Sequence, residues 1–465
     1  MKERSSRRRF ALVFALLVSS AGTACGRLEA SRTADRVLAR FRSTTGAKPL
    51  AASGMMRLSL SGPPGTSGVD EIRWESFRFR EAVRSAGLET ARGIESGRAW
   101  YTDFDGVTRV VSDEVLRELK TRSYFFRRAW LFANRENAWL ELGPADAERV
   151  SLDLKPEGGN RLRLTFSRRD GRLLAASAPR LALDFQTLSS WTDRSDPAAP
   201  VHVALAWTGL PTGPIPGVII GGERAVVPEA PRELRFERRS GALVAPASIS
   251  GRPVRLAIDA AESGPVAISP ALAEALGLSF ETDVWGRRLA PGASLEIAGA
   301  TWPSLWVRRD DALPADADAR AGAAIYRETV LEIDPLAGVL RVHDPERFAP
   351  PEGFYRAVID DDGDLPVAIL SRGKTNLRLA AGSDTGSAAL RVAAASAARA
   401  DVAGGEARGL AWGPVRLPAM PADVTAHGFS PDWGDDGLLG YPLLLRFHAI
   451  VDMPRRWIYL KPLEK

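Results

Sequence analysis

Two aspartates in the second half of the chain follow strand-like segments, and a pair of carboxyl groups can perform acid–base chemistry. Asp259 ends the alternating segment 254–259, and Asp384 comes shortly after the segment 377–379. Two carboxylates about 3 Å apart cannot both ionise, so they share one proton. One then acts as a general base on water while the other donates to a carbonyl oxygen. For this chemistry the fold must bring together two residues that are 125 positions apart.

The two acids belong to an internal repeat. Strand, helix and hairpin follow one another at 254–259, 269–277 and 330–342 in the first copy, and at 377–384, 392–400 and 449–460 in the second. The hairpin acids Asp334 and Asp452 are 118 residues apart, close to the spacing of the first pair. The repeat predicts two tandem β lobes, 235–347 and 348–465, after a Pro- and Gly-rich connector.

The most specific pattern in the chain begins at Asp436. An apolar-apolar-Gly motif ends at Gly440, and a strand pair follows through Asp452 to Pro462. This stretch resembles the retropepsin-like aspartic peptidases of bacteria, here in a tandem arrangement with pepsin-like pseudo-twofold symmetry. The resemblance implies that each lobe contributes an Asp-Thr-Gly loop and that the two aspartates meet where the lobes join.

The resemblance also implies roles for individual residues. Asp259 and Asp384 would form the catalytic pair of an aspartic-type endopeptidase, acting on a polypeptide substrate without cofactor or metal. The residues that would support the loops are Thr385, Gly386, Ser387 and Gly440. In the family the threonine hydroxyl bonds across to the opposite loop, and the glycine lets backbone N–H groups approach the carboxylates. Trp285, beside Gly286, would lie in the hairpin flap over the cleft.

The first lobe departs from the family pattern. Ala260-Ala261 follow Asp259 where the family has Thr-Gly, so the cross-lobe hydroxyl is missing and a Cβ stands where a tight turn prefers glycine. Arg320-Ala321 precede Gly322, whereas Leu438-Leu439 stand at the corresponding place in the second lobe.

The second lobe departs in another way, because Gly382-Ser383 precede Asp384 where the family has two apolar residues. Counting from Leu377, as the first copy counts from Val254, puts Gly382 in the acid's place. Asp384 is therefore either the second catalytic acid or part of a turn shifted by two residues. The function is then either peptide-bond hydrolysis or that of a pseudoenzyme, which binds an extended peptide by strand addition or a lipidated partner.

Residues 30–230 predict a separate β domain. Period-two segments at 56–60 and 162–166, Asp-Gly turns at 105–106 and 170–171, and helical patterns at 34–41 and 116–132 lie in this region. Together they predict an antiparallel sheet with helices covering one face.

The segments 97–103, 105–106 and 170–174 are similar to the periplasmic lipoprotein-carrier-like domains found before bacterial aspartic peptidase domains. That similarity implies a half-open barrel with an apolar groove for a lipid or acyl chain. The alternative is a packing or docking module whose aromatic residues form a core; these are Trp74, Phe77, Phe79 and Trp100.

Residues 1–25 have the parts of a secretory signal: a basic start, an apolar run at 10–18 and a small-residue exit. The run 6–10 fits the twin-arginine export pattern. Cys25, the only cysteine, stands where a bacterial lipoprotein signal is cut and acylated. We therefore expect a periplasmic lipoprotein, anchored to a membrane through Cys25. The alternative is an ordinary signal peptide cut after Ala24.

Charge and histidine content argue against two other classes. The formal net charge is +5, of which +4 lies in residues 1–25, so a nucleic-acid partner has no electrostatic support. The four histidines, His202, His343, His427 and His448, are scattered and share no metal-ligand spacing.

Overall fold

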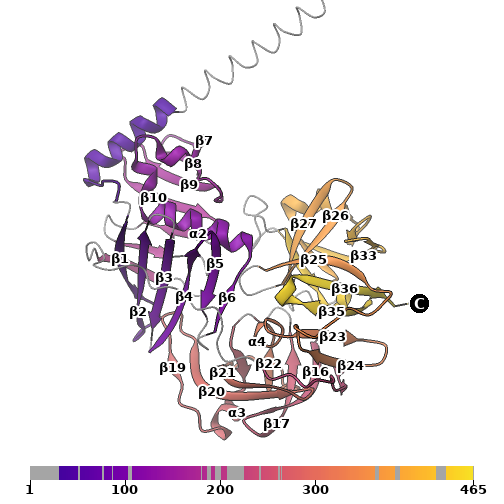
Figure 1. Cartoon of the computed structure of the whole chain (residues 1–465). Coiled ribbons are helices and arrows are strands. Elements are labelled where there is room, and N and C mark those ends of the chain that lie inside the picture. The colour runs from indigo at the N-terminus through magenta and orange to yellow at the C-terminus, as the bar shows by residue number, and fades with distance from the viewer. Residues whose placement is uncertain are drawn as a thin grey trace, which may run out of the picture. The chain divides into compact units, whose positions relative to one another are not determined.

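The computed structural model describes residues 31–50, 53–75, 78–85, 87–102, 107–179, 181–185, 190–193, 201–206, 225–239, 242–259, 262, 264–361, 366–382, 388–425 and 436–463. The described chain is mainly β and contains several antiparallel sheets, as the sequence predicts (Figure 1). Among the helices in these ranges, none is long and apolar enough to cross a membrane.

A sheet of thirteen described strands forms the N-terminal region, in the order β6-β5-β4-β3-β2-β1-β13-β12-β11-β10-β9-β8-β7. The strands are β1 (Ser53–Ser61), β2 (Ser67–Glu75), β3 (Arg78–Ser85), β4 (Leu88–Glu95), β5 (Arg98–Thr102), β6 (Thr108–Val110), β7 (Trp139–Ala145), β8 (Arg149–Lys155), β9 (Leu162–Ser167), β10 (Leu173–Ala178), β11 (Leu181–Asp184), β12 (Ser190–Asp193) and β13 (Val201–Ala206). The predicted strands 56–60 and 162–166 lie in β1 and β9, where every second side chain is buried. The alternation therefore identified the core face of each strand.

One helix precedes the strands of this sheet in the chain, and another lies between β6 and β7. A helix covers residues 31–45, and Phe41 on it contacts Phe166 of β9 at 5.8 Å between ring centroids. The predicted helix 116–132 is shorter, because α2 (Asp113–Phe126) ends before Arg128, which has a left-handed backbone. Trp74, Phe79 and Trp100 are buried, which fits the core alternative for these aromatics. Phe77 and the turn 105–106 lie outside the described residues.

Lobe 1 (residues 235–347) has an eight-stranded sheet in the order β15-β16-β17-β22-β18-β21-β20-β19. Its strands are β15 (Glu237–Arg239), β16 (Ala242–Ile249), β17 (Arg252–Ile258), β18 (Val266–Ile268), β19 (Glu281–Thr282), β20 (Arg288–Ile297), β21 (Ala300–Arg309) and β22 (Ala319–Ala321). The predicted helix 269–277 is present as α3 (Pro270–Ala275), and the hydroxyl of its N-cap Ser269 accepts from the Leu272 N–H. A second short helix, α4 (Ala323–Tyr326), follows β22 directly.

Lobe 2 (residues 348–465) repeats this series. Its strands are β25 (Tyr355–Asp361), β26 (Pro366–Arg372), β27 (Thr375–Gly382), β28 (Leu390–Ala393), β29 (Val402–Ala403), β30 (Glu406–Ala407), β31 (Ala411–Trp412), β32 (Val415–Arg416), β33 (Met420–Thr425) and β34 (Gly437–Gly440), followed by α6 (Tyr441–Leu444). The prediction of a helix over 392–400 was wrong in its first part. Val392 belongs to β28, fully buried between β33 and β34, and only α5 (Ala397–Ala400) is α-helical.

The two lobes share one sheet. β23 (Val330–Asp334), β24 (Val339–His343), β35 (Phe447–Asp452) and β36 (Trp457–Pro462) form the two predicted closing hairpins. The order β14-β24-β23-β35-β36-β25, with β14 (Leu234–Arg235) at one edge, makes these strands continuous between the lobes (Figure 1). β23 and β35 pair antiparallel, with Glu332 opposite Ile450. Since 332 and 450 are 118 apart, these are equivalent residues of the two copies, and the sheet has an internal twofold arrangement.

Candidate functional site

Asp259 stands at the end of β17, where three backbone contacts define its position. Its N–H donates to the Ala321 carbonyl at 2.9 Å, and its own carbonyl accepts from the Glu262 N–H at 3.0 Å. A Cβ added to Gly322 would lie only 2.0 Å from the Asp259 carbonyl oxygen. The residue is 4% exposed. The apolar-apolar-Gly motif of lobe 1 therefore packs its glycine against the turn that carries the acid.

Arg320, which replaces an apolar residue of that motif, takes part in a cluster of charges. Its guanidinium bonds Glu262 at 2.7 Å and Asp310 at 2.9 Å, and Arg308 bonds Glu262 at 3.0 Å. Burial raises the pKa of Glu262; Arg308 and Arg320 oppose this rise, and the nearby charge of Asp259 adds to it. In lobe 1 the strand of the motif, β22, is therefore present, but Arg320 belongs to an ion-pair network where the motif has an apolar side chain.

Two equivalent aspartates show which residues of the two lobes correspond to each other. In lobe 1 the Arg255 N–H donates to the Asp318 carboxylate at 2.9 Å, and in lobe 2 the Arg378 N–H donates to the Asp436 carboxylate at 2.9 Å. Asp318 and Asp436 in turn donate their N–H groups to the carbonyls of Arg255 and Arg378, at 2.9 and 3.1 Å. Arg255 and Arg378 therefore occupy the same position in the repeat.

From this anchor the acid position in lobe 2 can be counted. Asp259 is the fourth residue after Arg255, and the fourth residue after Arg378 is Gly382, which pairs with Gly440 in the parallel ladder of β27 and β34. Of the two alternatives that the sequence left open, this register favours the one with Gly382 in the acid's place. Asp384, Thr385, Gly386 and Ser387, and likewise Ala260-Ala261 of lobe 1, lie outside the described residues. The role of Asp384 stays a prediction.

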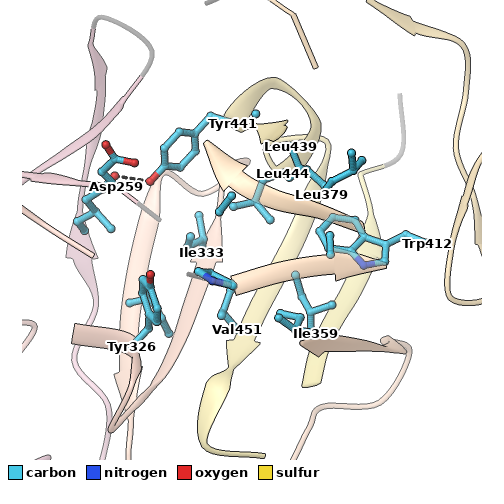
Figure 2. A pocket seen from close by; sticks show the side chains of 17 residues that line it. Asp259, Tyr326, Ile333, Ile359, Leu379, Trp412, Leu439, Tyr441, Leu444 and Val451 are labelled. Carbon is cyan, nitrogen blue, oxygen red and sulfur yellow. Dashed lines mark hydrogen bonds between the residues drawn. The ribbon is translucent and has the colours of Figure 1, made fainter. Parts of the chain in front are cut away.

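Tyr441 is a site residue that the sequence analysis missed. It begins α6 directly after Gly440, whose N–H donates to the Ala389 carbonyl at 2.9 Å. The Tyr441 hydroxyl donates to the carbonyl of Ile258 in the other lobe, next to Asp259 (Figure 2). At the equivalent position lobe 1 has Ala323. A cross-lobe hydroxyl bond thus exists here, but a tyrosine after the glycine motif supplies it.

An apolar cavity of about 60 Å³ lies next to Asp259. Its walls come from both lobes and from the shared sheet, and include Ile333, Leu379 and Val451. In Figure 2, Asp259 and Tyr441 lie beside each other at one end, and Trp412 lies at the other. The acid therefore stands at the edge of a space that is lined mostly by hydrocarbon.

Trp285 lies in the turn between β19 and β20 and is half-buried. Its backbone N–H donates to the Asp283 carboxylate at 3.0 Å, and the Arg287 guanidinium lies 5.1 Å from the centre of its ring. Arg287 also pairs with Asp283 at 2.7 Å. The turn is stabilised by its own side chains, and its role as a flap stays a prediction.

Two histidines that look unrelated in the sequence converge on one acid of the shared sheet. The Nε2 atoms of His343 and His448 lie 2.7 and 2.8 Å from the two carboxylate oxygens of Glu332, and Arg341 bonds the same acid at 2.6 Å. Burial raises the pKa of Glu332, but these partners lower it more, to about 2. In the described ranges, no group of three or more His, Cys, Asp or Glu side chains is arranged to hold a metal ion. His427 and Cys25 lie outside those ranges.

Comparisons with known proteins add little to this geometry. No protein-family model matches the chain, and no curated protein matches it in sequence. Among solved structures, a retropepsin-like aspartic protease from Rickettsia conorii is 16% identical over 24% of this chain and 90% of that one, with a TM-score of 0.20. MucB in complex with MucA(peri) is 12% identical over 59% of this chain and 92% of that one, with a TM-score of 0.15. The chain is a weak structural neighbour of both.

Proposed function

We propose that the C-terminal half binds an extended polypeptide where the two lobes join and does not hydrolyse it. The observation that supports this proposal is the strand register: the residue that corresponds to Asp259 in lobe 2 is Gly382. Aspartic catalysis needs two carboxyls that share one proton, because one must act as base while the other donates. A glycine at the second position supplies neither group.

Two further features support the binding role. Ala260-Ala261 remove the hydroxyl and glycine of the family loop in lobe 1. The Tyr441 hydroxyl instead connects the lobes through the Ile258 carbonyl. A duplicated β scaffold of this kind keeps strand edges to which an extended peptide can add its own backbone hydrogen bonds.

A peptidase is the second candidate, carried by the Asp384-Thr385-Gly386-Ser387 sequence. It requires the chain after β27 to turn back so that the Asp384 carboxyl reaches Asp259. The partners of an active pair would be a water molecule and a scissile carbonyl.

The test separates the two candidates with one purified protein. Fluorescein-labelled β-casein, an unstructured polypeptide, is incubated with the full chain between pH 3 and 7, and fragments and anisotropy are measured. We expect saturable binding and no fragments. Cleavage that pepstatin inhibits and that both Asp259→Asn and Asp384→Asn abolish would establish the peptidase instead. Absence of both binding and cleavage would overturn both candidates.

We also propose that the protein is exported and acylated at Cys25, on the strength of the sequence of residues 1–25. Incorporation of labelled palmitate into the native chain, and its loss in Cys25→Ser together with release from the membrane fraction, is the expected result. Equal membrane association of both forms would contradict the anchor.

A further inference from the structure

The cavity beside Asp259 is lined by more residues of lobe 2 than of lobe 1, and the repeat explains this asymmetry. Phe236 and Ile359 are equivalent, since their N–H groups donate to the carbonyls of Gly338 and Arg456, which are 118 residues apart. Ile258 and Ala381 are equivalent as well, since they pair with Ala321 and Leu439 in the two parallel ladders.

At each of these positions lobe 2 has the smaller side chain. The pairs, lobe 1 first, are Phe236 and Ile359, Leu243 and Pro366, and Ile258 and Ala381. All three lobe 2 residues line the cavity, whereas Phe236 and Leu243 are buried in the core of lobe 1. The smaller side chains of lobe 2 at these three positions therefore contribute to the void, in a core that is otherwise close-packed.

The lining determines which chemistry can enter. The walls are mainly aliphatic side chains, together with the rings of Trp412, Tyr326 and Tyr441, so a charged group deep inside would lose most of its hydration. A cavity of about 150 Å³ admits benzene, so one of about 60 Å³ admits a smaller group, such as the branched end of an aliphatic side chain. The acidic side chain of Asp259 at the edge disfavours a fatty acid carboxylate as the occupant.

We propose that this cavity is a binding site for a leucine-like side chain of the polypeptide held between the lobes. This assignment rests on the proposed function for its occupant, but not for the existence of the site. At the equivalent positions of lobe 1, the buried side chains of Phe236 and Leu243 fill the space. One bound polypeptide would therefore insert one anchoring side chain, next to Asp259 and Tyr441.

The first measurement tests the site without any peptide. The chemical shift of dissolved ¹²⁹Xe is titrated with the full chain and with Ala381→Ile, which copies the residue of lobe 1. We expect saturable xenon binding in the native chain and its loss in the variant, which should unfold at the same temperature or higher because the void is filled. Ile258→Ala, which enlarges the cavity, should bind xenon at least as well. Absence of xenon binding, or equal binding in Ala381→Ile, would overturn the site.

The second measurement tests the occupant. An extended Ser-Thr peptide with one central leucine is compared with the same peptide carrying alanine, and with decanoate. We expect the alanine peptide to bind about tenfold more weakly to the native chain but to differ by less than about twofold from the leucine peptide on Ala381→Ile. Xenon binding without discrimination between the peptides, or tighter binding of decanoate, would overturn the occupant while leaving the site. Failure of β-casein to bind would instead concern the proposed function.

Discussion

Gly322 touches the turn that carries Asp259 more closely than any side chain would allow. A Cβ there would lie 2.0 Å from the Asp259 carbonyl and 2.5 Å from the Glu262 carbonyl. We expect Gly322→Ala to lower the free energy of unfolding by about 3 kcal/mol or more, because backbone atoms must move. Urea unfolding measures this change.

A matched control is Gly292→Ala, where the opposite conditions hold. Nothing lies within 4 Å of the added Cβ, but φ is +83°. We expect a loss of only about 1 kcal/mol from the backbone conformation. Equal losses in the two variants would show that close packing at Gly322 is not the main constraint.

At the scale of single residues the sequence allowed part of the site to be predicted. The alternating pattern located Asp259 at a strand end, and the motif located Gly440. The sequence could not explain why an arginine stands at position 320, because the partners of Arg320, Glu262 and Asp310, come from separate loops. Nor could it choose between Gly382 and Asp384, since that choice depends on pairing between β27 and a strand about 60 residues later.

Asp318 and Asp436 accept the same backbone hydrogen bond at the start of β22 and β34. Because their surroundings differ, the two residues can be compared as a matched pair. Asp436 is buried and also accepts from the Ser396 hydroxyl at 2.6 Å and from Arg399, whereas Asp318 is partly exposed beside Arg255. We expect Asp436→Ala to lower the free energy of unfolding by about 3 kcal/mol, since it leaves buried partners unpaired. Asp318→Ala should cost about 1 kcal/mol or less. Chemical denaturation of both variants tests this, and a larger loss for Asp318→Ala would contradict it.

The Glu332 cluster on β23 predicts a dependence of stability on pH. The pKa of Glu332 in the folded chain is about 2, below the ordinary value of 4.5, so its ionised form is favoured by folding. The stabilisation is fully present above pH 4.5 and is lost as the pH falls toward 2. We expect the difference in unfolding free energy between the native chain and Glu332→Gln to be largest near pH 7 and to shrink between pH 4.5 and 2.

Urea titrations at a series of pH values make this measurement. Glu352→Gln, at an exposed position, serves as the control and should show little difference at any pH. A difference for Glu332→Gln that stays constant down to pH 2 would contradict the prediction.

Elements with strong local signals were predicted well, and those that depend on partners were not. Both closing hairpins and α3 follow from alternation, a capping serine and a proline at the helix start. The prediction of an alanine-rich helix was wrong for β28, because its strand conformation comes from its neighbours β33 and β34 rather than from its own residues.

At the scale of the whole C-terminal half, one core and one sheet run through both lobes. Leu331 and Val451 pair across β23 and β35 and belong to the same buried cluster. A protease site placed in the exposed segment 350–353 should therefore yield two fragments that stay associated in native buffer. Size-exclusion chromatography after cleavage should show a single peak that separates only in denaturant. Separation in native buffer would contradict a shared core.

The pairing of Glu332 with Ile450 has a consequence for self-association. Two copies of lobe 1 joined in the same way would oppose two Glu332 carboxylates, and two copies of lobe 2 would leave His448 without its acid. Each half is thus a poor partner for itself and a good one for the other. The charges on the shared sheet therefore favour the pairing of lobe 1 with lobe 2 over the pairing of either lobe with a copy of itself.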